Sequence, residues 1–129
     1  MEAEEQRVKE MARSVAITST QGFEGYRITR YGGYVSGDEV VLLSDSLFSL
    51  SGYSKDAIND SIKDVRLVAI EELKAAAAEL GCNAVVGLDF DYVTVDRQRP
   101  SLAGTPVNET FVILTANGTA VVIEPLVGC

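Results

Sequence analysis

The clearest pattern in the chain is an apolar stripe with helical spacing near its middle. Apolar residues recur every three or four positions, namely Ile58, Ile62, Val65, Ala69, Leu73, Ala76 and Leu80. This spacing predicts one long helix from about residue 54 to residue 80, with a single buried face. Ser54 or Asp56 is a suitable N-cap, and Gly81 supplies the residue type that most often ends a helix.

Alternation typical of a strand follows this helix, from residue 83 to residue 95. Val86, Leu88, Phe90 and Tyr92 alternate with Val85, Gly87, Asp89 and Asp91. Because successive side chains of a strand point to opposite faces, we expect the first set to pack on the helix and the second to face away. Residues 96–109 contain two prolines and a glycine, which predicts a long loop.

The rest of the chain contains further strand candidates. Residues 26–36 alternate, with Tyr26, Ile28 and Arg30 predicted on one face and Arg27, Thr29 and Tyr31 on the other. The pair Gly32-Gly33 inside this strand predicts a bulge. Residues 15–19 alternate weakly, which predicts a short strand. Residues 40–43 are apolar, and residues 44–54 are predicted to form a loop. In residues 110–125, Asn117-Gly118 predicts either a hairpin turn or one long strand bent at Gly118.

Together these elements predict one α+β domain over residues 15–125, which needs copies of itself to complete its core. Residues 1–14 are predicted to form a charged helical extension with a thin apolar stripe, and residues 126–129 a tail. Because its apolar stripe is thin, this helical extension is predicted to be either frayed or docked on a partner subunit.

The net charge of the chain argues against two classes of binding partner. The formal net charge is −8 at pH 7, which argues against nucleic acid and against anionic membrane surfaces as partners. No apolar run approaches the roughly 18 residues that a membrane span needs, and residues 1–14 contain no apolar signal region. We therefore expect a cytoplasmic protein.

The chain contains no histidine. This removes the commonest general base and the commonest zinc ligand, and no nucleophile–base pair of the serine–histidine or cysteine–histidine type can form. We therefore expect the protein not to be an enzyme and to carry no certain cofactor, with a divalent metal ion as the one candidate.

Asp89 and Asp91 are the leading candidates for binding such an ion, because residues two apart on a strand present their carboxylates on one face. The alternative is that they face water or form salt bridges with Arg27 or Arg30. Cys82 is predicted to be a small buried hydrophobic residue, with a thiolate metal site between symmetry-related copies as the alternative.

Three tyrosines cluster around the glycine pair. Tyr26, Tyr31 and Tyr34 flank Gly32 and Gly33, and aromatic residues beside a glycine-rich bulge are typical of either a ligand pocket or a core or subunit interface.

Three blocks of the sequence resemble the YbjQ-like family, which is labelled a "putative heavy-metal-binding" domain. The blocks are EGYRITRYGGYVSG, LGCNAVVGLDFDY and TANGTAVVIE, and the resemblance covers roughly residues 16–124. The chain differs from that family at Cys82, where a small residue is usual, in the length of residues 96–109, and in the extension before Arg13. The resemblance also favours the bent strand at Gly118.

The resemblance implies a two-layer, dodecin-like subunit in which an antiparallel sheet packs on one long helix. It also implies assembly into ring-like homopentamers, which in some members stack into decamers, with no assigned biochemical role. The sequence therefore predicts a homo-oligomeric binding or scaffold protein. The alternative is a protein that binds a metal ion or small ligand through carboxylates in the ring interior.

Overall fold

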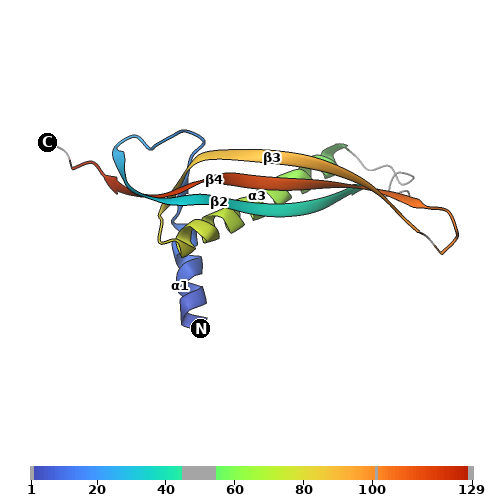
Figure 1. The fold of residues 1–129 in the computed structure, drawn as a ribbon, viewed down its shortest axis with the longest axis horizontal. Helices are drawn as coiled ribbons and strands as arrows, with labels where there is room; N and C mark the ends of the chain where they lie inside the picture. Colours follow the sequence, from blue (N-terminus) through green and yellow to red (C-terminus); the bar gives the residue numbers. More distant parts are fainter. Residues whose placement is uncertain (1, 45–54, 101, 128–129) are drawn as a thin grey trace.

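The fold is known from a computed structural model that describes residues 2–44, 55–100 and 102–127. Its elements along the chain are α1 (Glu2–Arg13), β1 (Ala16–Ile17), β2 (Tyr26–Ser44), α3 (Lys55–Glu79), β3 (Ala84–Arg99) and β4 (Val107–Pro125). Figure 1 shows the long strands β2, β4 and β3 side by side, with α3 crossing one face and α1 standing away from the sheet. The described residues thus have the α+β character that the sequence predicts.

The strands form one sheet in the order β1-β3-β4-β2. The central strand β4 pairs antiparallel with both β2 and β3, whereas β1 pairs parallel with β3. The sheet is therefore mixed, and the prediction of an antiparallel sheet was wrong at this edge. The physical reason lies in the chain path, because β1 and β3 each begin just after a helix and those two helices are in contact.

β2 is a single strand that contains both the strand predicted at residues 26–36 and the apolar run at residues 40–43. Relative to β4, β2 has one extra residue between Ile28 and Arg30 and another between Tyr31 and Gly33. Each bulge changes the face that the following side chains take. The predicted faces were therefore wrong beyond residue 28, since Tyr31 shares a face with Ile28 while Arg30 lies on the α3 side and donates to the carbonyl of Leu80 at 3.1 Å.

β3 contains a similar irregularity. Relative to β4, β3 has one extra residue between Val86 and Asp89, where Gly87 has a positive φ of 66°. This bulge leaves Val86 on the face opposite α3, whereas Leu88 and Phe90 pack on the α3 side. The predicted grouping of Val86 with Leu88 and Phe90 was wrong for that reason.

β4 runs without interruption through Gly118. A Cβ atom at Gly118 would lie 2.6 Å from Cγ1 of Val85 and 3.0 Å from the carbonyl oxygen of Val86. The glycine thus permits close approach of β3 at its bulge and forms no turn. The hairpin prediction at Asn117-Gly118 was wrong, and the alternative of one long strand holds.

The loop predicted over residues 96–109 is mostly strand. β3 continues to Arg99 and β4 begins at Val107. The outer part of this hairpin, residues 96–110, is called the arm below. In Figure 1 it extends beyond the first turn of α3.

α3 covers β2 and β4 with the predicted stripe, somewhat rotated in its last turns. Ala69, Leu73 and Ala77 are fully buried, whereas Leu80 is 43% exposed. Gly81 ends the helix with a φ of 73°, as predicted. The predicted caps Ser54 and Asp56, and the stripe residue Ile58, lie outside the side chains that the structure describes.

The sheet has an apolar cluster on each face. The larger one lies between the sheet and α3, and the smaller one comprises Ala84, Val86, Val121 and Ile123, with Phe23 and Ile28 packed against it. α1 joins the larger cluster through Ala12. Within the described ranges, no helix is both long enough and apolar enough to cross a membrane.

Candidate functional site

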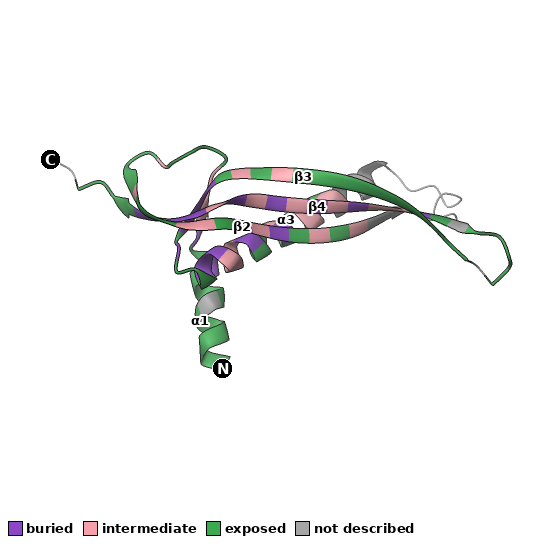
Figure 2. Cartoon of the chain, viewed as in Figure 1, coloured by how far each residue is buried: buried purple, intermediate pink, exposed green. Residues whose placement is uncertain are grey.

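The sheet face opposite α3 carries most of the candidate residues, and we call it the open face. Residues that pair directly across antiparallel strands share a face, and the register therefore defines its members. They include Tyr26, Tyr31, Tyr34, Ser36, Asp38 and Val40 of β2; Glu109, Phe111, Ile113, Thr115, Asn117 and Thr119 of β4; and Asp89, Asp91, Val93, Val95, Arg97 and Arg99 of β3. Figure 2 shows that the outer half of β3 is exposed along its whole length.

Asp89 and Asp91 lie together on this open face, as their spacing predicts. Both residues are exposed. Oδ2 of Asp91 accepts a hydrogen bond from the side-chain amide of Asn117 at 3.2 Å, and Oδ1 of Asp89 accepts one from the backbone N–H of Phe90 at 2.9 Å. Among the described residues, the other oxygen of each carboxylate has no hydrogen-bond donor, so that it is available to a cation or to a cationic side chain.

The arginines that the sequence offered as partners for these aspartates are bound elsewhere. Arg27 pairs with Glu124 at 3.6 Å. Arg30 donates to the carbonyls of Leu80 and Gly81 at the end of α3.

The three tyrosines also lie on the open face: Tyr26 lies there before either bulge of β2, and the two bulges bring Tyr31 and Tyr34 to the same face. Tyr26 pairs with Pro125, Tyr31 with Val121 and Tyr34 with Thr119. Tyr31 and Tyr34 are 70% and 71% exposed. Tyr31 borders a shallow hollow of about 300 Å³, which is lined by Gln21, Tyr31, Val86, Gly87 and Thr119.

Cys82 does not join this group. It is 1% exposed and lies on the α3 side of the sheet, where its Sγ is 3.9 Å from the carbonyl oxygen of Leu80. A Cβ atom at Gly32 would overlap the sulfur of Cys82, so Gly32 makes room for it, whereas Gly33 takes a positive φ of 118°. The structure therefore places Cys82 as the buried hydrophobic residue that the sequence predicts.

The open face becomes apolar toward the arm. Val40 is 52% exposed, Val93 54% and Val95 39%. Together with the partly buried Ile113 and Phe111, they form a stripe across three strands between the aspartates and the arm.

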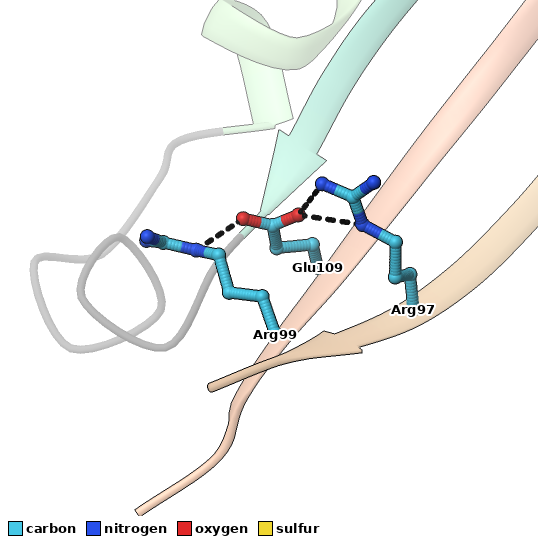
Figure 3. Close-up of polar contacts among 3 residues, drawn as sticks. All are labelled: Arg97, Arg99 and Glu109. Carbon is cyan, nitrogen blue, oxygen red and sulfur yellow. Dashed lines mark hydrogen bonds and ion pairs between the residues drawn. The ribbon is translucent and has the colours of Figure 1, made fainter. Parts of the chain in front are cut away.

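The arm carries an ion-pair cluster that the sequence did not reveal. The side chain of Glu109 is 8% exposed and lies between two arginines of β3. Arg97 donates to its Oε2 from Nη2 at 3.0 Å and from Nε at 3.3 Å, and Arg99 pairs with its Oε1 (Figure 3). The Arg97 guanidinium also lies 5.4 Å from the ring centre of Phe111. A single carboxylate thus fixes two guanidinium groups at the end of the apolar stripe.

A cavity of about 430 Å³ adjoins this cluster and is lined by Asp96, Arg97, Gln98, Asn108, Glu109 and Thr110. The signal for the cluster was present in the alternation of residues 93–99, which continues the strand beyond Val95. It was missed because the prolines and glycine farther on favoured a loop.

The described residues of one chain do not form a metal centre by themselves. No group of three or more cysteine, aspartate or glutamate side chains gathers in the described ranges. Cys82 is on the other side of the sheet from Asp89 and Asp91. Two carboxylates from one strand leave most positions around a Ca²⁺ or Mg²⁺ ion to other ligands.

Comparison with known proteins gives both a family and a fold. The chain is similar to a crystal structure from Pediococcus pentosaceus, described as a protein with unknown function of the DUF74 family. The two share 21% sequence identity with a TM-score of 0.51, over 85% of this chain and 98% of the other. The model of the YbjQ family, described as "Putative heavy-metal-binding", matches residues 15–124. The chain therefore belongs to the YbjQ family.

Proposed function

We propose that the protein is a homo-oligomeric, non-enzymatic binding or scaffold protein, built through the sheet surfaces that a single chain leaves uncovered. The observation that supports this proposal is the exposure of large side chains on the open face. Tyr31, Tyr34, Val40 and Val93 are each at least half exposed. Exposed aromatic and aliphatic side chains gathered on one face are typical of a protein interaction surface.

The two long edges of the sheet support the same proposal. The outer side of β2 and the outer half of β3 have no strand neighbour among the described residues. Unpaired edges attract other strands, and pairing with further copies of the chain removes them. A dodecin-like ring of five subunits, alone or stacked in pairs, is the assembly that the resemblance to the YbjQ-like family implies.

Composition supports the remaining parts of the proposal. The absence of histidine from the sequence leaves no histidine-based acid–base chemistry, and the net charge of −8 opposes nucleic-acid and membrane partners. We also propose a cytoplasmic location, because no apolar run in the sequence approaches the roughly 18 residues that a membrane span needs.

The assembly surface is tested by placing charge on it. The double variant Tyr34→Asp with Val40→Asp is expected to dissociate the oligomer, because buried unpaired carboxylates oppose association. Leu67→Asp on α3 is the matched control, since Leu67 is 62% exposed but lies away from the open face. Sedimentation velocity measures the outcome, and an unchanged assembly in the double variant would show that the open face is no interface.

A second candidate function is the binding of a divalent cation by Asp89 and Asp91. The observation that favours it is that both carboxylates share an exposed face while Arg27 and Arg30 are occupied elsewhere. Copies arranged around an axis would bring several such pairs together and complete an oxygen-ligand set.

This candidate is tested by the metal content of the assembled protein. Asp89→Asn with Asp91→Asn should abolish Ca²⁺ or Mn²⁺ binding in equilibrium dialysis, whereas Asp64→Asn with Glu79→Gln on α3 should leave it intact. Equal binding by both variants would exclude the two aspartates as ligands.

A further inference from the structure

The outer edge of β3 has a charge pattern that is complementary to itself. Along one face of this strand the side chains are, in order, Asp89, Asp91, Val93, Val95, Arg97 and Arg99. Two negative charges are followed by two apolar residues and then by two positive charges. A second β3 running in the opposite direction therefore presents arginine to aspartate at both ends and valine to valine in the middle.

The edge that carries this pattern is free in the described structure. β1 pairs with β3 only at Ala84 and Val85, and the N–H groups of Gly87 and Leu88 donate to the carbonyls of Thr20 and Thr18. Beyond this point β3 has a strand neighbour only on its β4 side. All residues from 91 to 99 are exposed. α3 packs mainly beneath β2 and β4, so it leaves the β3 edge accessible.

From this we infer that two copies of the protein pair edge to edge through β3, antiparallel and around a two-fold axis at Thr94. Asp89 then lies opposite Arg99 of the partner subunit, Asp91 opposite Arg97 of the partner subunit, and Val93 opposite Val95 of the partner subunit. The inference rests on the proposed self-assembly and gives it one specific surface and register.

The register follows from the charges. Opposite residues must share a face, so the alternatives shift the axis by one residue to Val93 or Val95, which moves the pairing by two residues. With the axis at Val93, Asp91 meets Val95; with the axis at Val95, Val93 meets Arg97. Each alternative places a charge against an apolar side chain. The axis at Thr94 alone pairs all six residues with a complementary partner.

Glu109 holds Arg97 and Arg99 in place while leaving them able to pair with the aspartates of a second β3. It holds Arg97 through Nε and Nη2 and Arg99 through Nε. A guanidinium has five N–H donors, so both arginines keep donors for a second carboxylate. Their side chains remain 61% and 48% exposed, which leaves them accessible to the aspartates of a partner strand.

The register is tested by cysteine cross-linking of the full chain carrying Cys129→Ser. In this variant the one remaining native thiol is that of the buried Cys82. Thr94→Cys lies opposite itself across the axis, so mild oxidation should convert most of the protein to covalent dimers. Tyr92→Cys and Asp96→Cys lie opposite each other. Each alone should stay uncross-linked, because its two copies are about 13 Å apart along the strands. A mixture of the two should form heterodimers.

The charges are tested in parallel by self-association measurements. Asp89→Lys with Asp91→Lys places lysine against arginine and should weaken pairing at least about 100-fold. Asp64→Lys with Glu79→Lys, an equal change of charge on α3, should leave it unchanged.

The outcomes separate this inference from the proposed function. The β3 pairing would be overturned, and the proposed oligomer retained, if the protein is oligomeric but Thr94→Cys forms no covalent dimers. The same holds if Asp96→Cys cross-links without Tyr92→Cys. A monomeric mass together with no cross-linking would overturn both.

Discussion

Gly37 lies where α3 comes closest to the sheet. A Cβ atom at this position would overlap the carbonyl oxygen of Ala69 and lie 2.8 Å from the backbone nitrogen of Leu73. Both neighbours are backbone atoms of the helix, which a side-chain rotation cannot move. The layer spacing between helix and sheet is thus set by a missing side chain.

Gly37→Ala is therefore expected to lower the free energy of unfolding by about 1–3 kcal/mol, the usual cost of overpacking. Gly22→Ala is the matched control, because a Cβ atom there meets nothing within 4 Å and the residue needs no positive φ. Urea denaturation at one fixed protein concentration measures both. Similar unfolding midpoints for the two variants would contradict the close packing of α3 on β2.

Glu109 is the buried charged residue of the described chain, and its two arginine partners make that burial possible. Glu109→Gln is expected to cost about 1–3 kcal/mol, because an amide no longer balances either guanidinium. Glu124→Gln is the control, since its pair with Arg27 is exposed on both sides and is worth about 1 kcal/mol or less. Urea unfolding checks the difference, and equal losses would show that Glu109 is screened by water.

At the residue scale, the sequence predicted where single side chains lie better than which side chains they contact. The two-residue spacing of Asp89 and Asp91 was enough to place them on one face, and the position of Cys82 after a helix end was enough to predict its burial. The cluster around Glu109 was missed, because its members meet only through the strand register of the arm, and the sequence had predicted a loop there.

At the scale of elements, bulges decide which side chains share a face, and three of them lie between residues 28 and 89. The sequence marked two of them with glycines, at Gly32-Gly33 and at Gly87, but glycine does not tell which neighbouring residue is the extra one. Every residue after a bulge changes face, so one unplaced bulge misassigns a whole strand. This explains why the elements were predicted well and their faces poorly.

The bulge at Gly87 gives a prediction of its own. A Cβ atom there meets nothing within 4 Å, but the φ of 66° is unfavourable for residues other than glycine. Gly87→Ala should therefore cost about 1–2 kcal/mol, and Gly87→Asn less, because asparagine tolerates this conformation. Thermal or urea unfolding of the two variants measures the order, and a less stable asparagine variant would contradict a purely conformational cost.

The long strands show where local signals fail. Asn117-Gly118 is a strong hairpin signal, yet both residues lie within β4, because the central strand is paired on both sides across this point. Tertiary pairing of this extent outweighs a turn preference. The same pairing extends β3 and β4 into the arm, where prolines and a glycine had suggested a loop.

At the scale of the whole molecule, the described residues cover one face of the sheet with α3 and leave most of the other face uncovered. Such a layer buries its second face or its edges against something else. The sequence predicted that the domain needs copies of itself, and the exposed tyrosines and valines of the open face support that hypothesis. The number of copies is not encoded in any local pattern.

The β3 pairing and the cation site draw on the same carboxylates. If Asp89 and Asp91 meet the arginines of a partner subunit, they are neutralised and lose their attraction for a cation. The two proposals therefore exclude each other at this position, and a chelator distinguishes them, since arginine pairing needs no metal.

Native mass spectrometry of the intact protein, with and without a chelator, tests the central claim of self-assembly most directly. We expect an even number of copies, as in two stacked rings of five, because pairing around a two-fold axis joins copies in twos. We also expect the chelator to leave the assembled mass unchanged. An odd number of copies would contradict the β3 pairing. A monomeric mass would contradict the account of this protein as an assembly built through its sheet.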